Sequence, residues 1–373
     1  MARSSMVPGM IRIGGRRLRF AISSNAAGPT ETATLEPGPL WAVNLHGFFA
    51  GGEMYSGESN HLATRLGWRV VNPSLPGFGG SQPLPWNLLS MRALADAVAA
   101  LLDHLGVERA VLLGHSMGGA VAIGFADRFP DRVLGIVYRD GAATPRWRDR
   151  RGMLPAALVP WAPDFAGPID LLLAAALDAP DLLLGRFHRT LPGLLPDVRR
   201  NIRTLGRTAP VAALLMTLDM REEVRRLAEA GDIPIVAEWG CFDRIAHAWT
   251  AAEFSEHAGV PVHWVPGGHS WMLARPRSQA DLFTSIDWGR RFVADAEERN
   301  RQLAGSARAD SPPAQPNPTQ PGPTQPNPTQ PNPTQPNPTQ PSPTQPSPTQ
   351  PSPTQPSPAQ PSPAQPSPAQ LTD

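Results

Sequence analysis

Short apolar segments recur along the chain, separated by longer stretches with helical periodicity. These segments cover residues 41–45, 68–72, 110–114, 133–138, 233–239 and 260–265. Continuous apolar runs of this length are typical of parallel strands that helices cover on both faces. The pattern therefore predicts an α/β fold with a doubly wound, mostly parallel sheet. Ligands of such sheets bind at the carboxyl ends of the strands.

One helix between these segments can be placed with its ends. Ser90 is a candidate N-cap, and Gly106 stands where a left-handed residue is wanted after the last turn. Between them, an apolar face follows the helical period, with Leu94, Val98, Leu101, Leu102 and Leu105. The spacing predicts a helix from about residue 91 to residue 105.

The alternation of strands and helices stops after Asp140. Residues 145–230 are helical in pattern and punctuated by proline, and they contain no convincing strand. We interpret them as a helical cap inserted above the strand ends. This gives a core in two parts, 1–144 and 231–300, separated by the cap and followed by a tail at 301–373.

The tail has a composition that cannot build a core. From Pro316 to Gln370 it consists of five-residue units that drift from PNPTQ to PSPTQ and PSPAQ. Proline at two positions in five prevents helix formation and strand pairing. We expect a disordered or polyproline-like segment, and three interpretations are open: a spacer, the binding site of a proline-reading partner, or a neutral expanded repeat.

Charge and composition narrow the function classes. The formal net charge is +1, so no strong field attracts nucleic acid. All 33 basic residues are arginine, which removes lysine-based Schiff-base chemistry. The most apolar stretch, 169–184, is interrupted by acidic residues and proline, so we expect no membrane span. No secretory signal is recognisable at the N-terminus, and we expect a cytoplasmic protein.

The most informative segment is AVLLGHSMGGAVAIGFADRF at 110–129. A buried strand ends at Gly114, and a helix pattern begins after Ser116. A sharp strand-to-helix turn exposes the serine oxygen, and the glycines at 114 and 118 let the strand and the helix approach each other closely. Ser116 is therefore a candidate nucleophile.

The motif GHSMGG after a buried strand resembles the nucleophile elbow of the α/β-hydrolase family. His46-Gly47-Phe48 after the strand at 41–45 resembles the oxyanion-hole segment of that family, and NPSLPGFGGSQ at 72–82 resembles its glycine-rich loop. The resemblance covers roughly residues 40–140 and 230–295. It implies Ser116 as the nucleophile, with the backbone N–H groups of Phe48 and Met117 as oxyanion donors.

The family order of nucleophile, acid and histidine points to two further residues. Asp243 follows the strand at 233–239, and His269 follows the strand at 260–265. A serine hydroxyl becomes an effective nucleophile when a neutral imidazole accepts its proton, and a carboxylate fixes the imidazole tautomer. Asp140, at the end of the strand at 133–138, is the alternative acid.

Carboxylic ester hydrolysis through an acyl-enzyme is the simplest reaction for these residues, and thioesters or lactones fit the same machinery. It requires no cofactor and no metal. The substrate pocket is expected to include His46, Gly47, Phe49 and Trp271 and to suit a small apolar acyl or aromatic ester. The alternatives are a cofactor-free perhydrolase or haloperoxidase, a C–C bond hydrolase, or a non-catalytic binding protein.

Overall fold

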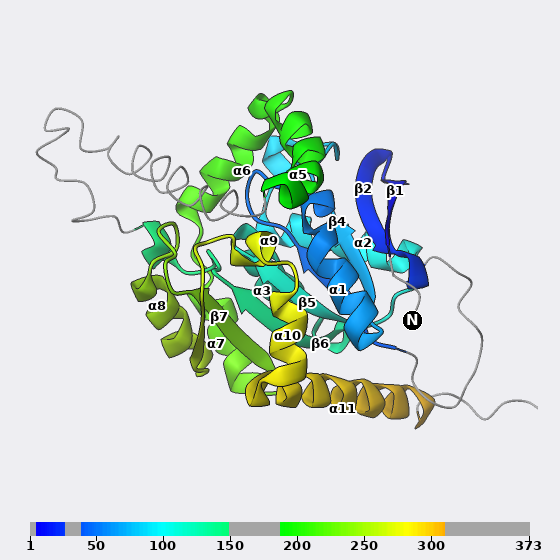
Figure 1. Cartoon of the computed structure of the whole chain (residues 1–373), viewed down its shortest axis with the longest axis vertical. Coiled ribbons are helices and arrows are strands. Elements are labelled where there is room, and N and C mark those ends of the chain that lie inside the picture. The colour runs from blue at the N-terminus through cyan, green and yellow to red at the C-terminus, as the bar shows by residue number, and fades with distance from the viewer. Residues whose placement is uncertain (1–4, 27–38, 149–186, 310–373) are drawn as a thin grey trace, which may run out of the picture. The chain divides into compact units, whose positions relative to one another are not determined.

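The computed structural model describes residues 5–26, 39–148 and 187–309. Eight strands in these residues form one sheet in the order β1-β2-β4-β3-β5-β6-β7-β8 (Figure 1). They are β1 (Met6–Ile13), β2 (Arg16–Ser23), β3 (Trp41–Leu45), β4 (Arg69–Pro73), β5 (Ala110–His115), β6 (Val133–Arg139), β7 (Ile235–Gly240) and β8 (Val262–Val265). The pairings of β1 with β2 and of β2 with β4 are antiparallel, and all the others are parallel. The predicted mostly parallel sheet is confirmed.

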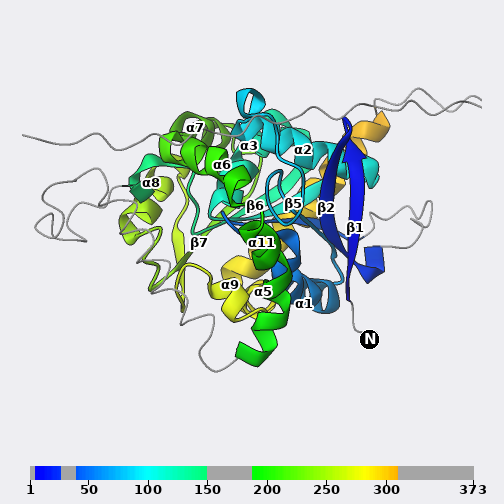
Figure 2. The same cartoon turned by 90° about the horizontal axis from the view of Figure 1, so that it is seen from above.

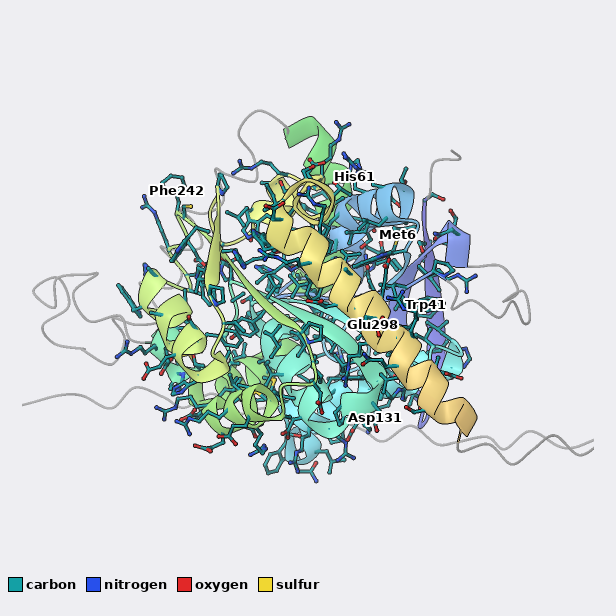
Figure 3. The ribbon with its side chains drawn as sticks, turned by 90° about the horizontal axis from the view of Figure 1, so that it is seen from below. Met6, Trp41, His61, Asp131, Phe242 and Glu298 are labelled. Carbon is teal, nitrogen blue, oxygen red and sulfur yellow. The ribbon has the colours of Figure 1, made fainter. Side chains whose placement is uncertain are left out.

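Helices cover both faces of this sheet. One face is covered by α2 (Met91–His104), α3 (Met117–Arg128), α7 (Arg221–Ala230) and α8 (Ala248–Ala258) (Figure 2). The other is covered by α1 (Ser56–Leu66), α10 (Ser278–Ser285) and α11 (Asp287–Ala309), the long helix that Figure 3 shows lying across it. Along β5, Leu112 belongs to the first core, whereas Val111 and Leu113 belong to the second. Burial on both sides explains the continuous apolar runs of the sequence.

The helix expected after residue 90 is confirmed together with its ends. α2 begins after Ser90, whose hydroxyl accepts the Ala93 N–H at 3.1 Å. Its leucine and valine face is buried in the first core. Gly106 follows the helix with a φ of 66°, a conformation that a side chain would strain.

The N-terminal hairpin of β1 and β2 was not among the expected strands. It turns at Gly14 and Gly15, whose φ values are 53° and 78°. Two consecutive residues with positive φ form the tight turn that matches the twist of an antiparallel pair. The signal was present in the sequence, because a glycine pair between two alternating segments is typical of a hairpin.

Between β6 and β7, all the regular structure described after Arg148 is helical. It contains α5 (Phe187–Ile202), α6 (Leu205–Thr217) and α7. Residues 149–186 of the predicted cap and residues 310–373 of the predicted tail lie outside the described residues. The cap, its boundaries and the tail's character stay predictions.

The predicted start of the tail at residue 301 is wrong. α11 continues to Ala309. Leu303 is half-buried against the second core, and its carbonyl accepts a hydrogen bond from Arg109. These contacts keep the last turns of the helix on the sheet, where composition alone suggested a linker. None of the helices in the described residues is long and apolar enough to cross a bilayer.

Candidate active site

Ser116 lies at the junction of β5 and α3. Its φ of 53° and ψ of −117° are rare for a residue with a side chain, which indicates backbone strain. The Ser116 N–H donates to the carbonyl of Arg139 at 2.9 Å, and the Ser116 carbonyl accepts the Ala142 N–H at 3.2 Å. These bonds tie the turn to the end of β6. The sharp strand-to-helix turn expected from the motif is present.

Two glycines allow this turn to lie close to its neighbours. A Cβ added at Gly118 would lie 2.1 Å from the carbonyl oxygen of Leu45, at the end of β3. A Cβ at Gly114 would lie 2.7 Å from the carbonyl oxygen of Gly118. Both distances are too short for any side chain. The spacing of glycines around Ser116 is therefore a requirement of close packing between β3, β5 and α3.

His269 and Asp243 meet at the carboxyl ends of β7 and β8. The Nδ1 atom of His269 lies 2.8 Å from Oδ2 of Asp243, and both side chains are buried. The other oxygen of Asp243 accepts the N–H groups of Ile245 and Ala246 at 2.7 and 2.9 Å. The ring of His269 lies 4.8 Å, centroid to centroid, from the ring of His115, the neighbour of Ser116. The structure thus brings the predicted base and acid together and places the base against His115, the residue before the predicted nucleophile.

Asp140, the alternative acid, lies next to this pair. One of its carboxyl oxygens accepts the Gly240 N–H at 2.7 Å, and the other accepts the indole N–H of Trp271 at 2.8 Å. One side-chain ligand atom from each of Asp140, Asp243 and His269 lies within 4.8 Å of the others. Burial, and then repulsion from Asp243, raises the pKa of Asp140 well above its usual range. Asp140 therefore takes up a proton at a higher pH than an ordinary aspartate does. The carboxyl group that contacts the imidazole of His269 is that of Asp243.

A chain of hydrogen bonds links the oxyanion segment, the elbow and the loop of His269. The Nε2 atom of His115 lies 2.9 Å from the carbonyl oxygen of His269 and must donate to it. Its Nδ1 atom then accepts from the hydroxyl of Tyr55 at 2.5 Å, and that hydroxyl accepts the Gly47 N–H at 3.2 Å. Burial lowers the pKa of His115 well below its usual range, so the ring stays neutral as this pattern requires.

The Tyr55→Phe variant is expected to lose about 2–4 kcal/mol of unfolding free energy. The change leaves the Gly47 N–H and Nδ1 of His115 buried without a partner, because both bonds depend on the one hydroxyl. Urea unfolding measures the loss. Tyr138→Phe is the matched control, since the Tyr138 hydroxyl bonds a single backbone group, the Ala143 N–H. An equal loss in the two variants would contradict the linking role of Tyr55.

The oxyanion segment after β3 lies against Ser116. A Cβ added at Gly47 would lie 3.2 Å from the Cβ of Ser116, so the chain passes close to the predicted nucleophile just before Phe48. Met117, the other predicted donor, is the first residue of α3, where a backbone N–H has no partner within the helix. The positions of both residues are compatible with the predicted donor roles.

The four predicted pocket residues differ in their surroundings. Gly47 adjoins Ser116, and Phe49 is half-buried with a φ of 61°. His46 is fully buried: its Nε2 accepts the Leu75 N–H at 2.8 Å, and its Nδ1 lies 2.8 Å from the Gly47 carbonyl oxygen. Trp271 is also fully buried and bonds Asp140. For His46 and Trp271 the observed contacts are structural, and a role in binding substrate stays a prediction.

The buried ring of His46 is expected to make the fold sensitive to acid. Burial lowers the pKa of His46 from 6.5 to about 4. Between these values the unfolded chain takes up a proton that the folded chain does not, so stability falls as the pH drops from 6.5 toward 4. The expected loss is about 2 kcal/mol between pH 7 and roughly pH 4.5, measured by urea unfolding. In His46→Gln the slope should be shallower, and an unchanged slope would contradict the assignment.

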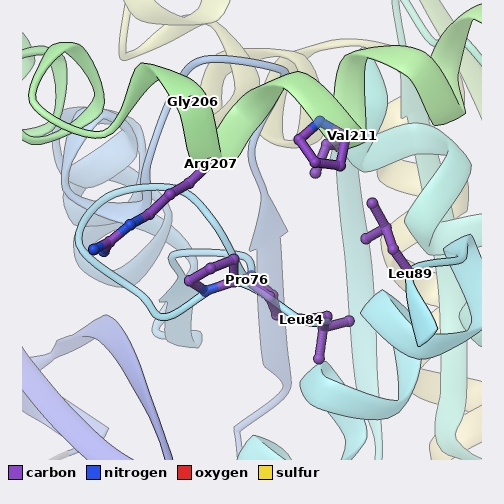
Figure 4. Close-up of a pocket in the computed structure, with 8 residues that line it drawn as sticks. Pro76, Leu84, Leu89, Gly206, Arg207 and Val211 are labelled. Atoms are coloured by element: carbon purple, nitrogen blue, oxygen red, sulfur yellow. The ribbon is translucent and has the colours of Figure 1, made fainter. Parts of the chain in front are cut away.

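A cavity of about 210 Å³ lies between α6 and the loop after β4 (Figure 4). Most of its lining is apolar: Pro76, Pro83, Leu84, Leu89, Gly206, Arg207, Pro210 and Val211. The four predicted pocket residues are not among those that line this cavity. The cavity is linked to the oxyanion segment through one hydrogen bond. Leu75, the residue before Pro76, donates its N–H to His46.

Comparison with known proteins settles the family. The family model of the alpha/beta hydrolase fold matches residues 43–255. The chain belongs to the α/β-hydrolase family. The matched region spans β3 to α8 and contains Ser116 and Asp243, and His269 follows it.

Relatives of this α/β-hydrolase carry several chemistries. A protein of Mycobacterium phage D29, named as a non-heme haloperoxidase, is 26% identical over 242 residues, which are 64% of this chain and 84% of the phage protein. The 2-hydroxy-6-oxo-6-phenylhexa-2,4-dienoate hydrolase of Comamonas testosteroni is 36% identical over 119 residues, 31% of this chain and 37% of that enzyme. A thermophilic esterase from Thermogutta terrifontis is similar in structure, with a TM-score of 0.51 and 24% identity over 78% of this chain and 99% of that one. The structural likeness shows the fold, and the family model shows the family.

Proposed function

We propose that this α/β-hydrolase cleaves a carboxylic ester, or a thioester or lactone, through an acyl-enzyme on Ser116. The observation that carries the proposal is the 2.8 Å bond between His269 and Asp243. It orients an imidazole whose own backbone is bonded to the residue before Ser116. A neutral imidazole held in this way is the base that a serine nucleophile requires.

The reaction follows from the roles of these groups. As the Ser116 oxygen attacks the carbonyl carbon, Nε2 of His269 takes the hydroxyl proton, and Asp243 stabilises the imidazolium. The backbone N–H groups of Phe48 and Met117 stabilise the negative charge on the carbonyl oxygen. The intermediate then expels the alcohol, which receives the proton from His269. Water, activated by the same imidazole, releases the acid and restores Ser116.

The proposed substrate has an apolar acyl or aromatic group. Support comes from Phe48, which is exposed and lies beside Phe49 and Phe78 at the oxyanion segment. The rings of Phe48 and Phe49 offer an apolar surface next to the place where the carbonyl would bind, and the fully buried ring of Phe78 packs against Phe48. Apolar surfaces with few polar groups suit small apolar ligands.

Hydrolysis of p-nitrophenyl esters of increasing chain length, from acetate to laurate, tests this proposal. We expect turnover by the wild-type chain that Ser116→Ala lacks. A fluorophosphonate probe should label the wild-type chain and not the variant. Labelling of neither would favour a non-catalytic binding protein over an enzyme.

The phage relative favours a second candidate function, a cofactor-free perhydrolase or haloperoxidase on the same triad. Peroxide-dependent halogenation without ester turnover would support that reaction and overturn the first. A C–C bond hydrolase is the third candidate, because the Comamonas testosteroni relative is named a 2-hydroxy-6-oxo-6-phenylhexa-2,4-dienoate hydrolase. Cleavage of a vinylogous diketone by a chain inactive on esters would reveal it.

A further inference from the structure

Asn201, near the end of α5, is bonded to the backbone that follows Phe48. Its side-chain N–H groups donate to the carbonyls of Phe49 and Ala50 at 2.8 and 2.9 Å, and its oxygen accepts the Gly79 N–H at 2.8 Å. The side chain is fully buried. Each of the three bonds joins residues that are more than 120 positions apart in the sequence. The amide therefore joins a helix of the insertion to the loops after β3 and β4.

Asp197, one turn earlier on α5, enters the same region. Its carboxylate accepts the Met54 N–H at 3.1 Å and pairs with Arg200 at 2.9 Å. A Cβ added at Gly51 would lie 2.5 Å from this carboxyl group, so only a glycine leaves room for it. Burial raises the pKa of Asp197 to about 6, against the opposing effect of Arg200. Two consecutive turns of α5 thus contact residues 49–54.

The backbone that Asn201 contacts is strained. Phe49 has a φ of 61°, an unfavourable conformation for a bulky residue that persists only where its surroundings impose it. The Asn201 amide bonds the carbonyl of Phe49 itself and that of the next residue. This turn spans residues 47–50, because the Ala50 N–H donates to the Gly47 carbonyl at 3.2 Å, and Phe48 lies within it. The direction of the Phe48 N–H therefore depends on whether the turn keeps its conformation.

We infer that Asn201 is a positioning residue for the oxyanion hole: it holds the Phe49 turn so that the Phe48 N–H faces the carbonyl oxygen of a substrate on Ser116. This inference rests on the proposed function. The insertion between β6 and β7 then contributes to catalysis through α5, and not only by covering the site. Asp197 supports the same contact from the preceding turn, through the Met54 N–H.

Asn201→Ala is expected to lower kcat for ester hydrolysis about 10- to 100-fold, because a displaced oxyanion donor stabilises the transition state less. KM should change less than about threefold, since the group acts on developing charge and not on substrate binding. The affinity of a trifluoromethyl ketone, which forms an oxyanion on the serine, should fall in parallel with kcat. Arg199→Ala, an exposed position on the same helix, is the matched control and should keep wild-type values.

Hydrogen exchange gives a readout that does not depend on activity. Amides of residues 47–54 should exchange faster in Asn201→Ala than in wild type and Arg199→Ala, with the rest of the sheet unchanged. If the alanine variant does not fold, Asn201→Ser, which keeps a short hydroxyl, serves in its place.

The outcomes separate the two proposals. Unchanged exchange together with unchanged kcat, or a rise in KM alone, would overturn the positioning role. If the wild-type chain hydrolyses no ester, the proposed function fails, and the exchange comparison alone decides whether Asn201 holds residues 47–54. A parallel loss of kcat and of ketone affinity supports both.

Discussion

Ser116→Ala is expected to lower kcat for p-nitrophenyl ester hydrolysis about 10⁴- to 10⁶-fold. The change removes the only atom that forms the acyl bond, while the oxyanion donors are backbone groups and remain. Because Cβ is kept, the strained backbone at this position is unchanged, and the melting temperature should stay close to that of wild type. Steady-state kinetics with active-site titration measures the effect.

His269→Ala should cost about as much as Ser116→Ala, and the double variant hardly more, because members of a catalytic triad act as a unit. His257→Ala provides the matched control, since His257 lies on α8, where its ring accepts a hydrogen bond from Arg225. Ester turnover that survives in Ser116→Ala at wild-type level would assign the activity to another residue and refute the proposed mechanism.

The second large effect distinguishes the two carboxyl groups. Asp243→Asn is expected to lower kcat about 10⁴-fold, because an amide facing Nδ1 of His269 favours the wrong imidazole tautomer. Asp140→Asn should lower kcat less than about tenfold. Its oxygens accept from Gly240 and Trp271, and an amide retains an acceptor for one of these bonds.

The two asparagine variants control for each other, since both replace a buried acid by an amide of the same size at neighbouring positions. Their folded fractions, from circular dichroism, should be compared before the rates. Near-normal turnover in Asp243→Asn together with a large loss in Asp140→Asn would reverse the assignment and make Asp140 the acid of the triad.

The sheet was predictable to a large extent because its strands are buried on both faces. The runs at 41–45 and 110–114 correspond to β3 and β5 within one residue. Double burial leaves no polar alternation, so such runs stand out from the helices around them. The hairpin of β1 and β2 was missed because β1 is largely exposed and β2 begins with the exposed pair Arg16-Arg17, and only the pair Gly14-Gly15 marks the turn.

Which carboxyl group contacts the imidazole of His269 depended on distances that local sequence does not contain. Asp140 and Asp243 both follow strands at the same edge of the sheet, and both are compatible with the chain order of such enzymes. The packing of Trp271 decides between them in the structure, since its indole N–H occupies one oxygen of Asp140. His269, four residues past the end of β8, is left with Asp243.

Tyr55, His115 and Asn201 show the limit of sequence patterns most clearly. Their hydrogen bonds join positions 60, 154 and 152 residues apart. No local spacing predicts such a contact, because it arises from how loops after different strands pack at one edge of the sheet.

The order of apolar runs and the glycines around Ser116 determined the sheet and the sharp strand-to-helix turn at Ser116, because backbone preference and strand burial act over a few residues. The carboxyl group that meets the imidazole, the neutral state of His115 and the attachment of α5 beside Phe48 were decided only by the tertiary structure. Each of these depends on a buried polar atom finding a partner from a distant part of the chain.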